Sequence, residues 1–339
     1  MKSKELAREI GVSEATMSLV LNGKPGISTK TREKVLRRVT ELGFGHMIQN
    51  VREEETSGQV VGFVNYKNNG ELLGLNSFFP LILDGIEDAA REGGYNLTII
   101  NIDREHADQQ IEFIEGANCI GYVLFATEMQ EEDLTPFLKL GKPFVLLDNQ
   151  FFSETIDTVK INNGQGIHLS VRYLREMGHS RIGYLTSGLP IKSFQERRKR
   201  AMEVLREYEA KTPEAYVYDV GYPYEKAEGG MEKILRTTPK DMLPTAFLTD
   251  NDLVAVGAIR AIERLGYRVP EDFSVIGYDD RPICSMITPK LTTVQVPRDA
   301  FGRMAMVELL RKIRGEKHYS VTIQLNGTLI PRESVRKLA

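Results

Sequence analysis

The chain has 339 residues, 41% of them hydrophobic, and a formal net charge of −3, so its length predicts two or three folded units. The longest apolar stretches, such as residues 60–64 and 121–126, are far shorter than the ~20 residues of a membrane helix, and the N-terminus lacks a signal-peptide core. Because Cys119 and Cys284 fit neither a disulfide framework nor a zinc motif, we expect a cytoplasmic protein without metal or cofactor.

Positive charge gathers at the amino terminus. Residues 1–44 contain nine Lys or Arg against five Glu, a surplus of four that leaves −7 for the rest of the chain. A small basic unit on an acidic body is typical of a protein whose head binds a polyanion while its body has another task. Charge alone would fit a solvated pair of basic helices equally well.

The same 44 residues carry the pattern of three short helices. Ser3 precedes the first helix, and Gly11, a residue type common at helix ends, ends it. Ser13 is placed to cap a second helix and Ser28 a third. The tight turn between the first two predicts a helix-turn-helix.

In a helix-turn-helix the second helix lies in the major groove, so its outward side chains read the DNA. Hydroxyl and amide groups suit phosphates, which fix the register. Glu14 can accept from cytosine N4, and Ala15 and Leu19 can contact thymine methyl groups. A plain protein-interaction module is the alternative. The predicted DNA-binding residues are Ser3, Ser13, Glu14, Ala15, Thr16, Ser18, Leu19, Asn22, Ser28, Lys30 and Thr31.

The pattern VS-x-x-T-x-S-x-V-x-N followed by TR-x-x-V resembles the headpiece of the LacI/GalR family of bacterial repressors. The resemblance implies a hinge helix after the headpiece that inserts a leucine into the minor groove. In this chain His46 stands where the family has proline and Glu53 where it has that leucine. A carboxylate there would be repelled by the phosphates that line the groove.

The departure leaves two expectations for the hinge. Either Met47, Ile48 or Val51 is the apolar wedge, or the operator is bound with little kinking. Residues 53–55 could equally be only a solvated run of charge.

From residue 59 onward, apolar strands alternate with amphipathic helices, which is typical of parallel βαβ units. Two such runs predict two lobes that enclose a cleft at the carboxyl ends of their strands. The expected strands are residues 60–66, 96–102, 119–126, 143–149, 181–187, 215–220, 245–250 and 273–280, and the expected helices are residues 79–93, 108–116, 134–140, 164–177, 196–208, 226–236 and 253–265.

This region resembles the family's core, which is similar to periplasmic sugar-binding proteins, through GHSRIGYLTSG, residues 245–280 and PKLTTVQVP. The resemblance implies an α/β fold: a three-helix headpiece and a two-lobed periplasmic-binding-protein-like core, each lobe a parallel sheet flanked by helices. The expected domains are the helix-turn-helix 1–44, the hinge 45–58 and the effector-binding and dimerisation core 59–339, with lobe 1 at about 59–160 and 292–322 and lobe 2 at about 161–291 and 323–339.

By position, the resemblance places Arg197, Asn251 and Asp279 against the effector. Such sets suit polyols, because they offer acceptors and fork-shaped donors to adjacent hydroxyls, and aromatic side chains such as Tyr222 could form a wall. Phe78 and Phe79 cannot both face the cleft readily, since they are adjacent. The predicted effector-binding residues are Phe78, Phe79, Asp148, Arg197, Tyr224, Asn251 and Asp279.

Two local points stay open. Asp252 and Asp280 are expected to stabilise turns rather than to contact the effector. The basic run 197–200 does not tell which arginine faces the cleft, or whether its charge marks an anionic effector or a solvated helix face.

Together these features predict a transcriptional repressor that binds a near-palindromic double-stranded operator as a homodimer and is controlled allosterically by a small molecule, a sugar or a sugar derivative. One alternative is a sugar-binding sensor without specific DNA binding, which the unusual hinge suggests. The other is an α/β enzyme acting on a sugar or nucleotide. Against the enzyme, the sequence has no phosphate-binding glycine loop and no G-x-S-x-G or H-E-x-x-H motif, and we expect His179 to be structural.

Overall fold

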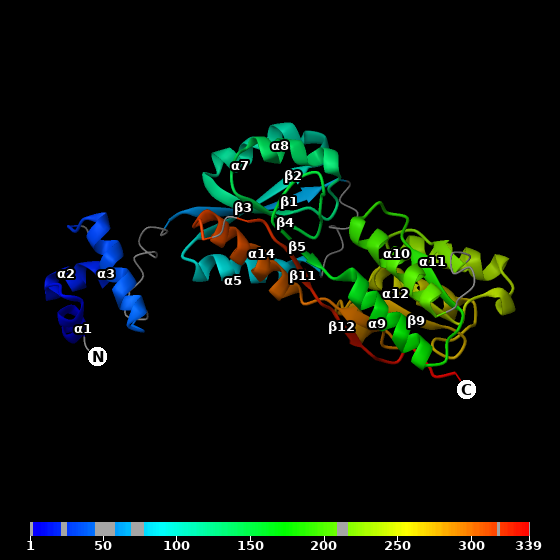
Figure 1. Ribbon diagram of the computed structural model, residues 1–339. Coiled ribbons are helices and arrows are strands. Elements are labelled where there is room, and N and C mark those ends of the chain that lie inside the picture. Colours follow the sequence, from blue (N-terminus) through cyan, green and yellow to red (C-terminus); the bar gives the residue numbers. More distant parts are fainter. Residues whose placement is uncertain are drawn as a thin grey trace. The chain divides into compact units, whose positions relative to one another are not determined.

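The computed structural model describes residues 3–21, 26–44, 58–68, 78–208, 216–316 and 319–338. The chain divides into two compact units, Met1–Gln59 with Ala90–Asn96, and Val60–Ala89 with Leu97–Ala339. Figure 1 shows the helical headpiece within the first unit and the sheets and helices of the second. In the described part of the chain no helix is both long and apolar enough to span a membrane.

The headpiece contains α1 (Ser3–Ile10), α2 (Glu14–Leu21) and α3 (Thr29–Glu41). Both predicted caps are confirmed: Ser13 Oγ accepts from the backbone N–H of Thr16 at 3.0 Å, and Ser28 Oγ accepts from that of Thr31 at 3.2 Å. These bonds satisfy N–H groups that the first turn of a helix leaves unpaired. The three helices enclose one apolar cluster of buried side chains: Leu6, Ala7, Met17, Val20, Leu21, Val35 and Val39.

The second unit contains two six-stranded sheets, each at the centre of one lobe. The sheet of lobe 1 has the order β11-β5-β4-β3-β1-β2, and that of lobe 2 the order β12-β10-β9-β8-β6-β7. Pairing is parallel between the neighbours whose register is defined, except that β12 runs antiparallel to β10. The strands are β1 (Val60–Lys67), β2 (Asn96–Asp103), β3 (Cys119–Phe125), β4 (Phe144–Leu147), β5 (Thr158–Ile161), β6 (Ile182–Thr186), β7 (Val217–Asp219), β8 (Ala246–Thr249), β9 (Ser274–Asp279), β10 (Thr292–Gln295), β11 (Thr322–Leu325) and β12 (Thr328–Ile330).

Helices connect most consecutive strands, as a βαβ pattern requires, whereas β4 joins β5 and β11 joins β12 without a helix. The expected helix 108–116 is divided into α6 and α7, and the expected helix 134–140 into a 3₁₀ turn and α8. The helices of this unit are α5 (Phe79–Glu92), α6 (Ala107–Gln110), α7 (Glu112–Gly116), α8 (Thr135–Lys139), α9 (Asn163–Glu176), α10 (Lys192–Glu207), α11 (Tyr224–Thr237), α12 (Asp252–Arg264), α13 (Ile283–Met286) and α14 (Arg298–Ile313).

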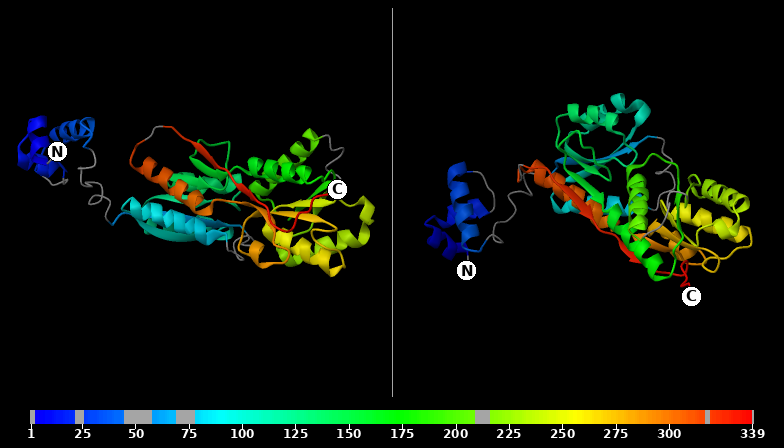
Figure 2. Two further views of the ribbon diagram at one scale, coloured as in Figure 1. Left: turned by 90° about the horizontal axis from the view of Figure 1, so that it is seen from below. Right: turned by 45° about the vertical axis from the view of Figure 1, so that its right-hand side comes forward.

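The chain crosses between the lobes three times, and two crossings differ from the expected positions. Residues 292–295 were expected in lobe 1, but β10 pairs with β9 in the sheet of lobe 2. Residues 323–325 were expected in lobe 2, but β11 pairs with β5 in the sheet of lobe 1. Between them α14 packs on β3, β4 and β5, so the last strands lie in alternate lobes (Figures 1 and 2).

Candidate functional site

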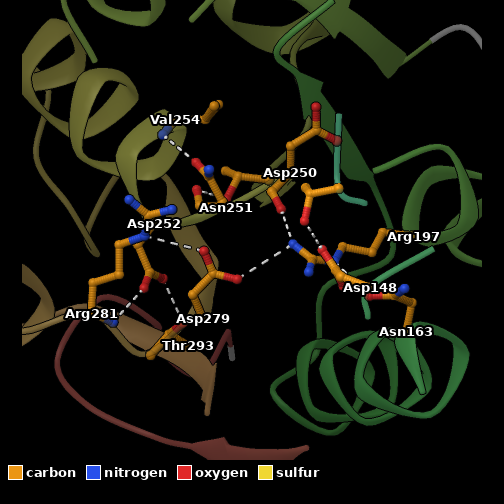
Figure 3. A network of polar contacts seen from close by, with 12 residues as sticks. Asp148, Asn163, Arg197, Asp250, Asn251, Asp252, Val254, Asp279, Arg281 and Thr293 are labelled. Atoms are coloured by element: carbon orange, nitrogen blue, oxygen red, sulfur yellow. Dashed lines mark hydrogen bonds and ion pairs between the residues drawn. The ribbon is translucent and has the colours of Figure 1, made fainter. Parts of the chain in front are cut away.

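The carboxyl ends of strands from both lobes meet at an interlobe cleft, as expected for open parallel sheets. Asp148 follows β4 of lobe 1, whereas Asp250 and Asn251 follow β8 and Asp279 ends β9 of lobe 2. Figure 3 shows Asp148 and Asp279 beside Arg197 of α10, the backbone oxygen of Asp250 turned toward the guanidinium, and the Asn251 side chain turned toward Val254. The residues that line the cleft are Phe78, Phe125, Thr127, Asp148, Ser193, Phe194, Arg197, Asn251, Asp279 and Arg281.

Arg197 is a buried cation held from several sides, with only 4% of its surface exposed. Its Nε donates to Asn163 Oδ1 at 2.9 Å, and its Nη1 donates to the carbonyl oxygen of Asp250 at 2.6 Å. Nη1 also lies 3.6 Å from Asp279 Oδ1, and the guanidinium carbon lies 3.7 Å from the centre of the Tyr278 ring. Burial opposes the charged form, yet attraction to Asp279 and its neighbours raises the pKa of Arg197. A fixed positive charge therefore faces the cleft.

Asp250, which sequence reasoning did not single out, fixes the turn that holds Arg197. Its fully buried carboxylate accepts from the Tyr184 hydroxyl at 2.9 Å and from Thr186 Oγ1 at 3.1 Å. The backbone N–H and the hydroxyl of Ser187 also donate to it, at 2.6 and 2.7 Å. A carboxylate with four donors is strongly oriented. Its place directly after a buried strand was the only sequence signal for this role.

Asp148 supplies an acceptor from lobe 1. It is partly buried and accepts from Thr127 Oγ1 at 2.8 Å. Burial raises the pKa of Asp148 to about 6, and the bond from Thr127 limits that rise. The residue is therefore largely ionised at neutral pH and close to protonation in mild acid.

Asn251 has two separate tasks. Its Oδ1 accepts from the backbone N–H of Val254 at 3.1 Å and thereby caps α12. Its Nδ2 is buried and has no hydrogen-bond partner within the described ranges, although the residue lines the cleft. A residue that lines the cleft therefore carries a buried donor without a partner in the described part of the chain.

The aromatic predictions separate into two groups. Phe78 lines the cleft, whereas Phe79 is half-buried with its ring centre 5.5 Å from that of the buried Phe63 and is not among the cleft residues. Tyr224 is not among the cleft residues: it lies on α11 beside Arg260 and borders a separate apolar hollow. Sequence reasoning missed the cleft residues Phe125 and Phe194.

The remaining local expectations are resolved by contacts. Asp252 accepts from the backbone N–H of Arg281 at 2.8 Å and from Thr293 Oγ1 at 2.6 Å, and Asp280 accepts from Arg332 at 2.6 Å, so both hold turns as expected. In the basic run only Arg197 lines the cleft. Arg198 and Lys199 are exposed, and Arg200 pairs with Glu203 and Glu207 of the same helix.

In the headpiece the exposed face of α2 carries the predicted reading residues. Met17, Val20 and Leu21 are buried, whereas Glu14, Ala15 and Ser18 are exposed and Leu19 is half-buried. Lys4 Nζ of α1 lies 2.9 Å from Glu14 Oε1. The predicted residues Asn22, Met47, Ile48 and Val51, and the unusual His46 and Glu53, lie outside the described residues.

The hydroxyl groups predicted to contact phosphates form two matching pairs. Ser13 Oγ and Thr16 Oγ1 are 2.8 Å apart at the start of α2, and Ser28 Oγ and Thr31 Oγ1 are 2.8 Å apart at the start of α3. Ser13, Ser28, Lys30 and Thr31 are exposed. Helix starts with exposed donors are suitable phosphate sites.

A helix-turn-helix with an exposed second helix, on the same chain as a two-lobed core with a polar cleft, defines a DNA-binding regulator of the ligand-responsive class. Residues 3–45 match the model of bacterial regulatory proteins of the lacI family, and residues 171–335 match that of the periplasmic binding protein-like domain. The chain belongs to the LacI/GalR family of bacterial transcriptional regulators. It is a DNA-binding repressor with a small-molecule effector.

Relatives match along nearly the whole chain. The ribose operon repressor of Haemophilus influenzae is 29% identical over 342 residues, which cover 99% of this chain and 98% of the relative. The transcriptional repressor PurR of Vibrio vulnificus is 26% identical over 338 residues, with the same two shares. A solved complex of the transcriptional regulator CelR with cellobiose is 26% identical, with a TM-score of 0.73 and coverage of 98% of this chain and 99% of that one.

Proposed function

We propose that a sugar or a sugar derivative binds in the interlobe cleft and controls how tightly this repressor binds its operator. The observation that carries the proposal is the buried guanidinium of Arg197, fixed by Asn163, Asp250 and Asp279 at the floor of a cleft with an aromatic wall. Names of similar proteins support a sugar, since one relative is a ribose operon repressor and one solved relative contains cellobiose.

The chemistry of the cleft suits a polyol. Asp148 and Asp279 supply acceptors from opposite lobes, and Arg197 and Asn251 supply donors. Phe78 offers an apolar face to the carbon side of a sugar ring. Because these groups come from both lobes, a ligand that contacts all of them favours one arrangement of the lobes over another.

On the DNA side, we propose that the exposed residues of α2 enter the major groove. The hydroxyl pairs of Ser13 with Thr16 and of Ser28 with Thr31 hold phosphates, and Ala15 and Leu19 contact bases. The set is completed by Ser3, Glu14, Ser18, Asn22 and Lys30. On the DNA, Glu14 either accepts a hydrogen bond from a base in place of its ion pair with Lys4 or retains that ion pair.

The assembly and coupling complete the proposal. Two protomers place two headpieces on the half-sites of a near-palindromic operator in the cytoplasm, and Met47, Ile48 or Val51 acts as a wedge or the DNA stays nearly straight. In this proposal the DNA-binding domain spans residues 1–44, the hinge residues 45–58 and the effector-binding core residues 59–339. An effector that binds one state better changes operator affinity by the same coupling free energy. The regulator needs no enzymatic step, cofactor or metal.

Fluorescence anisotropy tests this function directly. The full chain is titrated into labelled fragments of the DNA around its own gene, with and without a panel of sugars. We expect tight, salt-dependent binding to one fragment that a sugar changes. Equal binding to every fragment would favour a sensor without specific DNA binding, and turnover of a sugar would favour an enzyme.

A further inference from the structure

Arg281 is a second buried arginine of the cleft, two residues beyond Asp279, with only 4% of its surface exposed. Its backbone N–H donates to Asp252 Oδ2 at 2.8 Å, and its Nε donates to Asp279 Oδ2 at 3.2 Å (Figure 3). These two bonds fix the backbone of Arg281 and the Nε edge of its guanidinium. The Nη1 nitrogen remains as a donor that is not used by these bonds.

Three buried polar groups beside one another lack a hydrogen-bond partner in the described part of the chain. They are Arg281 Nη1, Asn251 Nδ2 and the Tyr222 hydroxyl. Burial raises the pKa of Tyr222, whereas the charge of Arg281 and hydrogen-bonding contact with the Arg281 and Asn251 side chains lower it, so the three groups lie within reach of one another. None of the three atoms completes a hydrogen bond with another group in the described part of the chain. Buried donors without acceptors cost free energy, so their clustering at a cleft indicates that an acceptor from outside the chain completes them.

The nearby Asp279 carboxylate accepts from Arg281 Nε but not from Arg281 Nη1, which has no partner in the described part of the chain. Asp279 Oδ2 accepts from Arg281 Nε, and Asp279 Oδ1 lies 3.6 Å from Arg197 Nη1. A ligand hydroxyl could accept from the unused donors, but its own proton would then need a further acceptor. A carboxylate or phosphate group brings acceptors alone, and its bonds to a guanidinium are charge-assisted.

Charge and packing around Arg281 fit an anionic group. The cleft lining has two arginines, Arg197 and Arg281, against two aspartates, so a ligand with negative charge meets no net repulsion. The guanidinium carbon of Arg281 lies 5.8 Å from the centre of the Phe78 ring of lobe 1. An anion held by Arg281 would therefore lie where the two lobes face each other.

We propose that Arg281, with the amide of Asn251, binds an anionic oxygen group of the effector, which makes the effector a sugar acid or a sugar phosphate. The inference rests on the proposed function only in taking the interlobe cleft as the effector site. It adds a residue for which the sequence gives no motif.

Matched ligands test the proposal on the full-length chain by isothermal titration calorimetry. The sets are glucose, glucuronate and glucose 6-phosphate; galactose, galacturonate and galactose 6-phosphate; and ribose, ribonate and ribose 5-phosphate. In one set an acidic member should bind about tenfold or more tightly than its neutral parent. Preference for the sugar acid identifies a carboxylate, and preference for the phosphate ester a phosphate. Equal or tighter binding of neutral parents, or no binding by any member, overturns the proposal.

Substitutions then assign the preference to Arg281. Arg281→Met should lose about tenfold of the acidic ligand's advantage, and Arg281→Lys, which keeps a charge without the fork, should lose part of it. Arg298→Met is the matched control: Arg298 lies at the same 5.8 Å from the Phe78 ring but is not among the cleft residues, so the preference should survive. A preference unchanged in both Arg281 variants would contradict the assignment.

Operator binding separates failure of this inference from failure of the proposed function. Thermal unfolding first shows which variants are folded. The comparison of ligands is made on the unmodified chain, so it holds even if a variant fails to fold. A chain that binds an operator and responds only to neutral sugars keeps the proposed function and loses the inference. A chain that prefers acidic ligands but binds no specific DNA keeps the inference and loses the proposed function.

Discussion

Arg197 donates a 2.6 Å hydrogen bond to the backbone carbonyl oxygen of Asp250, so the turn after β8 holds the cation that faces the cleft. The position of this turn depends in its own right on the Asp250 carboxylate, which gathers donors from β6 and the residue after it. The position of Arg197 in the cleft is thus fixed by buried groups, the Asp250 carboxylate and its donors, that do not themselves line the cleft. Changes at these supporting groups should affect the effector as well as stability.

The first prediction concerns this support. Asp250→Asn replaces one acceptor oxygen by an NH₂ group that meets donors, which leaves buried N–H or O–H groups unpaired. We expect a loss of about 1–3 kcal/mol in the free energy of unfolding, measured by urea titration, and weaker effector binding. The control Asp241→Asn changes an exposed side chain and should leave both quantities unaltered. Wild-type stability of Asp250→Asn would show that the donors find other partners.

The second prediction concerns Arg197 itself. Arg197→Met keeps an apolar stem of similar length but removes the charged donors, and charge-assisted bonds contribute about 1.5–3 kcal/mol. Calorimetry should therefore show effector affinity reduced about tenfold to a hundredfold. Arg198→Met changes the exposed neighbour on the same helix and should bind as the wild type does. The opposite ranking of the two variants would place the cleft on the wrong face of α10.

The third prediction concerns pH. The pKa of Asp148 is raised to about 6, chiefly by burial, so its carboxylate takes up a proton as the pH falls through that value. An effector hydroxyl that donates to the ionised form must displace this proton, so effector affinity should rise with pH up to about 6 and level off above it. Calorimetry at pH 5 should give about tenfold weaker binding than at pH 7.

Asp148→Asn supplies the control for the pH profile, because an amide does not titrate in this range. The variant should bind more weakly at pH 7 and show a flat profile between pH 5 and pH 7. An equally steep profile in the variant would assign the proton to another group.

The fourth prediction separates register from base reading in the headpiece. Thr16→Ala removes one hydroxyl of the exposed pair at the start of α2 and should weaken binding to all DNA sequences alike. Leu19→Ala removes a predicted contact with a thymine methyl group and should reduce discrimination at one base pair by about 1 kcal/mol. Anisotropy with a set of single-base operator variants measures both, and a uniform loss with Leu19→Ala would remove it from the base-reading set.

Much of this architecture could be predicted because its signals are local. Ser13 and Ser28 cap helices by bonds to residues three positions on, and Asp148 was found because it ends an apolar strand. Asp279 came from the family resemblance, and it too stands at the end of a strand. The direction in which a side chain points at the end of a strand or the start of a helix depends also on packing against residues that are distant in the sequence. For that reason the sequence left both Phe78 and Phe79 open between core and cleft, and only Phe78 is among the residues that line the cleft.

What could not be predicted depends on long-range pairing. Nothing within residues 292–295 or 322–325 indicates which sheet they join, because the choice is made by partners such as Ile276 and Val159 far along the chain. Tyr224 was expected at the cleft for its residue type alone, whereas α11 carries it to another surface. Arg281 had no motif, and only its buried, unused nitrogen marks it.

Coupling between the cleft and the headpiece is the central claim, and one titration tests it most directly. Calorimetry first identifies a ligand that binds the full chain and binds the Arg197→Met variant more weakly, which assigns its binding to the cleft. Operator affinity of the full chain is then measured by anisotropy at rising concentrations of that ligand. The account predicts that operator affinity changes by about 1–3 kcal/mol and saturates at the concentration at which the cleft fills. Full occupancy of the cleft with no change in operator affinity would contradict it.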